Sequence, residues 1–175
     1  MQYLTDTDLA GERGCIMSDC GAYRLRLWRQ WDVTLPRLGV CMLNPSDARH
    51  NVDDSTDTRI YLRAVSLGFG RYDIVNLFPL SSSKPEVMRA HPDPVGPLDI
   101  ANQMILDVAA DASMILCAWG AGEFAATRAR AVLQLLCDAG YAEKLVHLGL
   151  NKDGSPKHPL YIAASTRPKP FEFTA

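Results

Sequence analysis

Four short apolar runs recur along the chain, and each ends abruptly at a polar residue, a proline or a glycine. They occupy residues 38–43, 73–78, 114–119 and 145–148. Runs of this length, bounded by turn residues, are typical of buried strands. Stretches with apolar side chains at helical spacing separate them, at residues 58–67, 98–110 and 123–139. The alternation predicts a parallel sheet with helices on both faces.

Segment 23–29 has a different pattern, because apolar and basic residues alternate along it. This period of two predicts a strand with one face in water. The link to residues 38–43 is short, which favours antiparallel pairing of the two strands and places 23–29 at the sheet edge. The basic residues of this segment are Arg24, Arg26 and Arg29. Such arginines usually form a solvated surface, and a phosphate clamp is the alternative.

These patterns predict a three-layer α/β/α sandwich with a four-stranded parallel core sheet and an N-terminal antiparallel edge strand. The chain of 175 residues is long enough for one full core. We assign the single domain to residues 23–165 and a C-terminal tail to residues 166–175. Residues 1–22 are polar and contain turn-forming glycines. We expect them to be an N-terminal extension with at most a short helix.

Composition narrows the functional classes. The net charge of −2 argues against a strongly basic protein that binds DNA without sequence preference. No stretch approaches the roughly 18 apolar residues of a membrane span, and the N-terminus lacks an apolar signal core. We therefore expect a soluble, cytoplasmic protein with no membrane partner. The sequence leaves the oligomeric state open.

Cysteine and histidine spacing gives no metal motif. The five cysteines form no C-x-x-C pair, and the four histidines are scattered without ligand spacing. Cys41, Cys117 and Cys137 lie in apolar stretches and are expected to be buried, reduced thiols. The Gly120-x-Gly122 pair lacks the remaining features of a dinucleotide fingerprint. Neither a metal nor a cofactor is expected.

The predicted strands bring polar residues to one edge of the sheet, because the carboxyl ends of parallel strands lie together. The residues at the ends of these strands, just after them or in the loop after the fourth are Asn44, Pro45, Ser46, Asn76, Phe78, Trp119, Gly120 and His158. Ligands bind at this edge in open α/β sheets. We therefore expect the binding site there, lined by these residues.

Two asparagines are the strongest candidates for chemistry. Asn44 has an amide that can orient water, with Asp54 as its partner, and Asn76 can read the edge of a nucleobase. A buried amide at a strand end also needs hydrogen-bond partners, which favours a ligand at Asn76. The structural alternatives are a turn residue before Pro45 for Asn44 and a helix cap for Asp53 or Asp54.

Other side chains have plausible supporting roles. His158 can donate a hydrogen bond to a developing oxyanion, and an ordinary loop histidine is the alternative. Phe78 or Trp119 can stack on a ring, and filling the core is the alternative. Lys152 and Lys157 either meet a phosphate or are solvated.

Several ordered motifs resemble the DUF1643 family, a bacterial and phage family of unassigned function. The matching motifs lie at residues 23–31, 42–46, 53–56, 76–78, 96–97, 118–120 and 148–161. They span about residues 20–165, so the resemblance covers most of the chain.

A more distant resemblance is to the uracil-DNA glycosylase superfamily. Its members place an Asn-Pro or Asp-Pro motif after the first core strand, a base-reading Asn after the next, and a His-Pro motif in a late loop. Asn44-Pro45, Asn76 and His158-Pro159 occur here in the same order. The resemblance implies a glycosylase-like fold, with Asn44 positioning water, Asn76 holding the base and His158 near the base carbonyl.

Three functional hypotheses follow. The first is a nucleobase-recognising protein of glycosylase-like fold that hydrolyses an N-glycosidic bond in DNA or a nucleotide, with Asn44, Asp54 and His158 as catalytic residues. The second is a non-catalytic module that binds a modified base or nucleotide. The third is a metal-dependent small-molecule hydrolase that uses Asp53 and Asp54.

Overall fold

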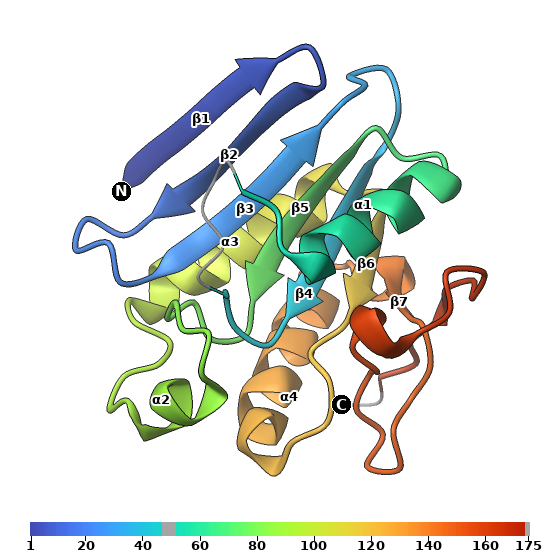
Figure 1. Cartoon of the computed structure of the whole chain (residues 1–175). Coiled ribbons are helices and arrows are strands. Elements are labelled where there is room, and N and C mark those ends of the chain that lie inside the picture. The colour runs from blue at the N-terminus through green and yellow to red at the C-terminus, as the bar shows by residue number, and fades with distance from the viewer. Residues whose placement is uncertain (47–51, 174–175) are drawn as a thin grey trace.

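One mixed sheet forms the centre of the computed structural model, which describes residues 1–46 and 52–173, and helices cover both of its faces (Figure 1). The strands lie in the order β1-β2-β3-β5-β4-β6-β7-β8. They are β1 (Gln2–Asp8), β2 (Gly11–Met17), β3 (Arg24–Gln30), β4 (Arg37–Met42), β5 (Arg71–Asn76), β6 (Met114–Cys117), β7 (Leu145–His147) and β8 (Lys169–Pro170). The helices are α1 (Ser55–Ser66), α2 (Pro85–Ala90), α3 (Leu98–Asp111) and α4 (Glu123–Asp138), with short 3₁₀ turns η1 (Ala142–Lys144) and η2 (Pro159–Tyr161).

Strand direction changes across the sheet. β4 pairs in parallel with both β5 and β6, and β6 pairs in parallel with β7. The β1–β2, β2–β3, β3–β5 and β7–β8 pairs are antiparallel. The predicted α/β class is therefore confirmed. The carboxyl ends of β4 and β5 lie side by side, since Met42 is in register with Asn76.

The N-terminal part of the sheet differs from the prediction. Segment 23–29 was expected at the edge beside residues 38–43, but β3 is an internal strand between β2 and β5. Residues 1–22, expected to hold at most a short helix, supply β1 and β2. β2 forms part of the sheet because it buries Cys15 and Ile16 against it. β1 could not be predicted, because it is exposed along its whole length and its sequence shows no alternation.

The two faces of the sheet have separate apolar cores. α3 and α4 cover one face, where Val108, Val132 and Leu136 pack on the strands. α1 covers the other face through Ile60 and Ala64. Figure 1 shows α1 in front of the sheet with α3 and α4 behind it. No helix among the described residues is long and apolar enough to cross a membrane.

The cysteines follow their predicted environment in the centre of the sheet. Cys41 and Cys117 are free, fully buried thiols on neighbouring strands, and Cys15 on β2 is also buried. Cys137 is partly buried and Cys20 is exposed. Burial raises the pKa of Cys41 to about 12, which makes it an inert core residue.

A buried ion cluster fixes the middle of β5. The Asp73 carboxylate is 2% exposed and receives hydrogen bonds from Arg26 at 2.8 Å and from Arg71 at 2.7 and 2.8 Å. Arg71 also lies over the Trp28 ring, 5.5 Å from its centroid. The arginines of β3 therefore do not form a solvated face: Arg26 pairs with Asp73, and Arg24 and Arg29 are buried at 5% and 7% exposure.

A second buried arginine joins α1 to the C-terminal segment. Arg63 is 5% exposed, and its guanidinium donates to four backbone carbonyls, at distances of 2.6–3.5 Å. The acceptors are the carbonyl oxygens of Ile162, Ala163, Ala164 and Thr166. Because η2 directly precedes these residues, Arg63 holds the His158 loop against the helix that follows Asp54.

Candidate ligand-binding site

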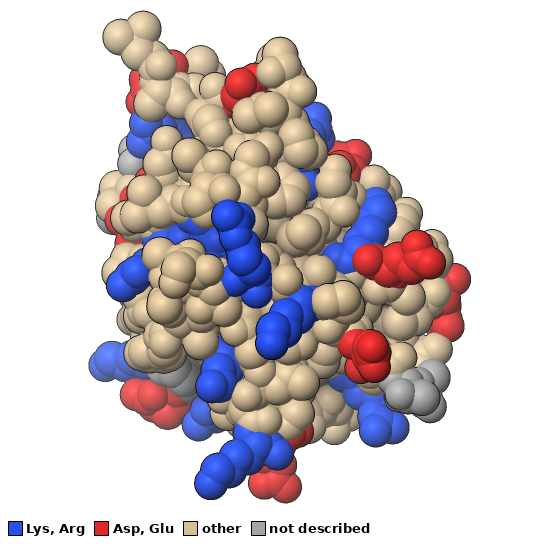
Figure 2. Space-filling view, turned by 90° about the vertical axis from the view of Figure 1, so that its right-hand side faces the viewer, with Lys and Arg blue, Asp and Glu red and all other residues tan. Residues whose placement is uncertain are grey.

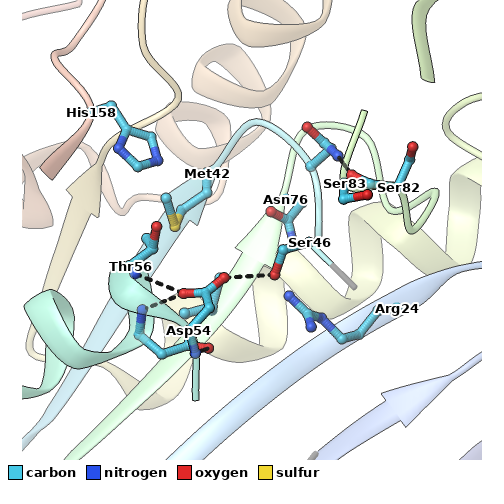
Figure 3. Close-up of a pocket in the computed structure, with 12 residues that line it drawn as sticks. Arg24, Met42, Ser46, Asp54, Thr56, Asn76, Ser82, Ser83 and His158 are labelled. Carbon is cyan, nitrogen blue, oxygen red and sulfur yellow. Dashed lines mark hydrogen bonds between the residues drawn. The ribbon is translucent and has the colours of Figure 1, made fainter. Parts of the chain in front are cut away.

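A small polar cavity, here called the amide pocket, opens where β4 and β5 end (Figure 3). Its volume is about 160 Å³. It is lined by Arg24, Met42, Asn44, Ser46, Asp54, Thr56, Asp57, Ile74, Asn76, Ser82, Ser83 and His158. Five of the predicted site residues, from four separate segments, therefore lie around one cavity. They are Asn44, Ser46, Asp54, Asn76 and His158.

Asn76 is a buried polar side chain in the lining of the amide pocket. It is the last residue of β5, with 3% of its surface exposed. Within residues 1–46 and 52–173, its side-chain amide makes no hydrogen bond, although it lies at the cavity wall. Buried polar groups almost always have partners, so an amide left open toward a cavity is poised to bind a ligand or water.

Asn44 forms hydrogen bonds of the turn type that was its structural alternative. Its Nδ2 donates to the Pro45 carbonyl at 3.0 Å and to the Ser82 carbonyl at 2.8 Å, and Ser82 N–H donates to the Pro45 carbonyl at 3.1 Å. These bonds tie the loop after β4 to the loop after β5, which is the turn role. They also fix the amide orientation, so that Oδ1 is the part of the group left to accept a hydrogen bond in the pocket.

Asp54 is a helix cap. Its Oδ1 accepts from the Thr56 and Asp57 backbone N–H groups at 2.7 and 2.8 Å, which completes a capping box with Asp57 at the start of α1. Its Oδ2 accepts from the Ser46 hydroxyl at 2.8 Å. Both carboxylate oxygens are therefore occupied by the protein, which weakens the expectation that Asp54 activates water.

Asp57 and Arg24 bring charge to the amide pocket, and the sequence patterns did not mark either as a leading site residue. Asp57 is 3% exposed, and burial, reinforced by the nearby Asp54, raises its pKa from 3.8 to about 6. The Arg24 guanidinium opposes this rise. In Figure 3, Arg24 and His158 lie on opposite sides of the pocket, with Asp54 and Asn76 between them.

His158 has a defined protonation state. Burial lowers its pKa, with a smaller opposing effect of Asp54. Its Nδ1 accepts from the Leu160 backbone N–H at 3.3 Å, which caps η2. A neutral imidazole that accepts at Nδ1 carries its proton on Nε2. His158 thus enters the pocket as a neutral donor.

Several predicted ligand residues lie outside the amide pocket. Phe78 is 4% exposed and packs on Phe124, with 4.8 Å between ring centroids. Trp119 is also 4% exposed and faces Phe171 at 6.1 Å. Both aromatic rings therefore belong to the core. Pro45 contributes its carbonyl to the bonds described above, and Lys152 is exposed beyond the pocket.

Gly120 and Lys157 line a neighbouring cavity, the tyrosine cavity, of about 490 Å³. Its other lining residues are Ala121, Asn151, His158, Tyr161 and Ile162. His158 is the residue that both cavities share.

Comparison with known protein families identifies the family of the chain. The model of the family described as "Protein of unknown function (DUF1643)" matches residues 24–160. The chain belongs to the DUF1643 family. The match begins at Arg24 and extends past His158, so every residue lining the amide pocket falls inside it. No curated protein and no solved structure shows significant similarity to the chain.

The described part of the acidic loop of this DUF1643 protein, from residue 52 onward, directs its two neighbouring aspartates to partners within the protein. Asp53 forms an ion pair with Arg29 at 2.6 Å, while its neighbour Asp54 turns to the helix cap. In the part of the chain that the structure describes, no three His, Cys, Asp or Glu side chains are grouped as they would be around a metal ion. Asp47, also in this loop, lies outside the described residues. The described residues of this loop therefore give no support to the metal-dependent hydrolase.

Proposed function

We propose that the amide pocket recognises a nucleobase and that Asn76 reads the hydrogen-bonding edge of the base. The observation that carries the proposal is the Asn76 amide, which is buried at a strand end and has no partner among the described residues. An amide offers a donor and an acceptor side by side, and nucleobase edges present the complementary pair.

The rest of the amide pocket supports a small heterocycle. Asn44 adds an oriented acceptor, and His158 adds a neutral donor. The volume of about 160 Å³ is below that of sites for drug-sized ligands, which suits a single ring system. The order of Asn44-Pro45, Asn76 and His158-Pro159 also resembles the uracil-DNA glycosylase superfamily, and a glycosylase-like fold is part of this proposal.

A second candidate function is hydrolysis of the N-glycosidic bond of the bound base. Two lining residues favour it: His158, whose environment favours the neutral imidazole, and the buried Asp57, whose pKa is raised to about 6. In this reaction, water attacks the anomeric carbon and passes a proton to the Asp57 carboxylate. The bond from carbon to the base nitrogen breaks, and the base leaves with its electron pair while His158 stabilises the developing charge.

Binding is tested by calorimetry with a panel of nucleosides and nucleotides that carry normal, deaminated and modified bases. Wild type should bind at least one member, and Asn76→Ala should weaken binding by more than tenfold, since paired buried hydrogen bonds to a base are worth about 1–3 kcal/mol. Asn76→Asp is the matched variant, because it keeps the shape but replaces the amide donor by an acceptor. It should change which base binds best. Equal binding by all three proteins would refute base reading by Asn76.

Hydrolysis is tested by chromatography of released base. Base release that is lost in both His158→Ala and Asp57→Asn supports the enzyme. Tight binding without release identifies a binding module. Release that is unchanged by His158→Ala would exclude the proposed stabilisation of the leaving base.

A further inference from the structure

The tyrosine cavity lies next to the amide pocket. Both cavities have His158 in their lining, so a ligand bound in the smaller one lies close to the larger one. The tyrosine cavity holds about 490 Å³ against about 160 Å³ for the amide pocket. A free base or nucleoside in the amide pocket would leave this larger space unused.

Tyr161 provides an exposed aromatic surface at the tyrosine cavity. It is 82% exposed, and its ring lies 5.8 Å from the His158 ring at an interplanar angle of 52°. It belongs to η2, which is capped by His158 and held by the Arg63 contacts to the residues that follow. An aromatic ring on an anchored turn can stack a base without a large loss of side-chain entropy.

A cation lies in the same cavity as this aromatic ring. Lys157 lines the tyrosine cavity, and residues 152–169 contain four Lys or Arg residues against one Asp, in a chain whose net charge is −2. Figure 2 shows this side of the molecule, where Lys and Arg side chains lie across the middle of the face and acidic side chains lie nearer its margins. Asn151 adds a neutral polar group to the cavity.

We propose that the tyrosine cavity binds the sugar-phosphate backbone and one neighbouring base of a single nucleic-acid strand, with Lys157 at a phosphate and Tyr161 stacked on the base. The proposal rests on the nucleobase function of the amide pocket and names its substrate class: a base carried in a strand instead of a free nucleotide. Stacking platforms combined with a positive groove are the physical basis of single-strand binding.

The charge distribution predicts that electrostatic attraction makes a modest contribution to the affinity for a single strand. A chain of net charge −2 with one local cluster of cations contacts few phosphates, so the salt dependence should be shallow. Each phosphate contact to a single strand contributes about −0.7 to the slope of log affinity against log salt concentration. Removal of one contact should therefore be resolved as a change in that slope.

The test uses fluorescence anisotropy with labelled single strands of DNA and RNA of mixed sequence, each about 10 nucleotides long, and with matched duplexes. Unlabelled mononucleotides serve as competitors. Wild type should bind a single strand more tightly than a mononucleotide or a duplex. Tyr161→Ala should weaken single-strand binding by about tenfold. Lys157→Gln should make the salt slope shallower by about 0.7.

Two matched variants control for general effects. Tyr3→Ala removes an exposed tyrosine on β1, at the opposite edge of the sheet, and Arg89→Gln removes an exposed cation on α2. Neither should change affinity or salt slope. A comparison of the DNA and RNA strands then identifies which sugar the cavity accepts.

The outcomes separate this inference from the proposed function. Equal affinity for strands and mononucleotides, unchanged by Tyr161→Ala and Lys157→Gln, would overturn the strand-binding inference while the Asn76 effect on nucleotides stands. Strand binding that depends on Tyr161 and not on Asn76 would support this inference and refute base reading. Absence of binding to any strand overturns the inference.

Discussion

β5 carries two buried polar side chains that have opposite relations to the rest of the protein. Asp73 is 2% exposed and is held by Arg26 and Arg71. Asn76, three residues later, is 3% exposed, and in the described part of the chain no group bonds to its amide. The two residues point to opposite faces of the sheet, because strand side chains alternate.

The difference separates structure from function. Asp73 satisfies its hydrogen-bonding capacity within the fold, so its loss should affect stability. The Asn76 amide has no such bonds to lose, so its replacement should affect a ligand. Burial alone does not distinguish the two residues. The hydrogen-bond partners of each side chain distinguish them. The following changes test this contrast, from the largest expected effect on stability to the smallest.

Asp73→Ala should lower the free energy of unfolding by about 3–5 kcal/mol, because it leaves the largely buried Arg71 guanidinium without its counter-charge and leaves Arg26 only the more distant Asp111, at 3.8 Å. Urea denaturation measures this loss. Asp8→Asn is the control, since Asp8 pairs with Arg13 at the surface and its side chain is 51% exposed. The control should cost at most about 1 kcal/mol. Similar losses in both variants would show that the buried Asp73 ion pairs stabilise the protein no more than an exposed pair does.

Asp57 should make stability depend on pH. Its pKa is near 6 in the folded protein and 3.8 as the ordinary value, so the folded state binds more protons between these values. The free energy of unfolding should therefore fall as pH rises from about 4 to 6, by up to about 3 kcal/mol, and then level off. Denaturation curves of wild type and Asp57→Asn across this range check the prediction. The variant, which keeps the acceptor oxygen, should lack this contribution, and an identical pH profile in both proteins would refute it.

Asp54→Ala should lower the free energy of unfolding by about 1–2 kcal/mol, because α1 loses its N-cap. Asp54→Ser should restore most of this stability, since serine is also a good cap. The pair also separates structure from chemistry when both variants are assayed for ligand binding and base release. Full activity in the serine variant would show that Asp54 acts only as the helix cap. A stable but inactive serine variant would show that Asp54 takes part in the reaction.

Asn76→Ala should change the free energy of unfolding by less than about 1 kcal/mol, because no internal hydrogen bond is broken. The same variant should lose ligand binding. Thermal denaturation with and without the best-binding nucleotide measures both quantities, since a ligand raises the melting temperature only of a protein that binds it. A strongly destabilised Asn76→Ala would show that the amide has a structural role after all.

The apolar runs were a reliable guide to the centre of the sheet. β4, β5, β6 and β7 fall where the runs predicted them, because each strand is largely buried and apolar residues predominate in its sequence. β1 is exposed along its length, so its sequence carries no such pattern. The arginines of β3 were misleading for a related reason: partners that are distant in sequence, such as Asp73, determine whether a charge is solvated or buried.

The candidate site was predicted in outline and not in detail. Asn44, Asn76 and His158 line one cavity, as expected from the rule that the carboxyl ends of parallel strands lie at one edge of the sheet. This rule depends only on parallel topology. It did not identify Asp57, whose significance comes from burial beside Asp54 on a helix. It also predicted that Phe78 and Trp119 stack on a ligand, but both rings are packed in the apolar core. A strand end gives the position of a residue, whereas the direction of a large ring depends on packing.

The contacts of Arg63 have a consequence for how the molecule opens. Its guanidinium joins α1, which begins at the Asp54 cap, to the backbone just after the His158 loop. Local unfolding that frees one of these segments must break the bonds to the other, so the two form one cooperative unit. Amide hydrogens on α1 and on residues 160–162 should then exchange with solvent at a common rate that slows when the amide pocket is filled.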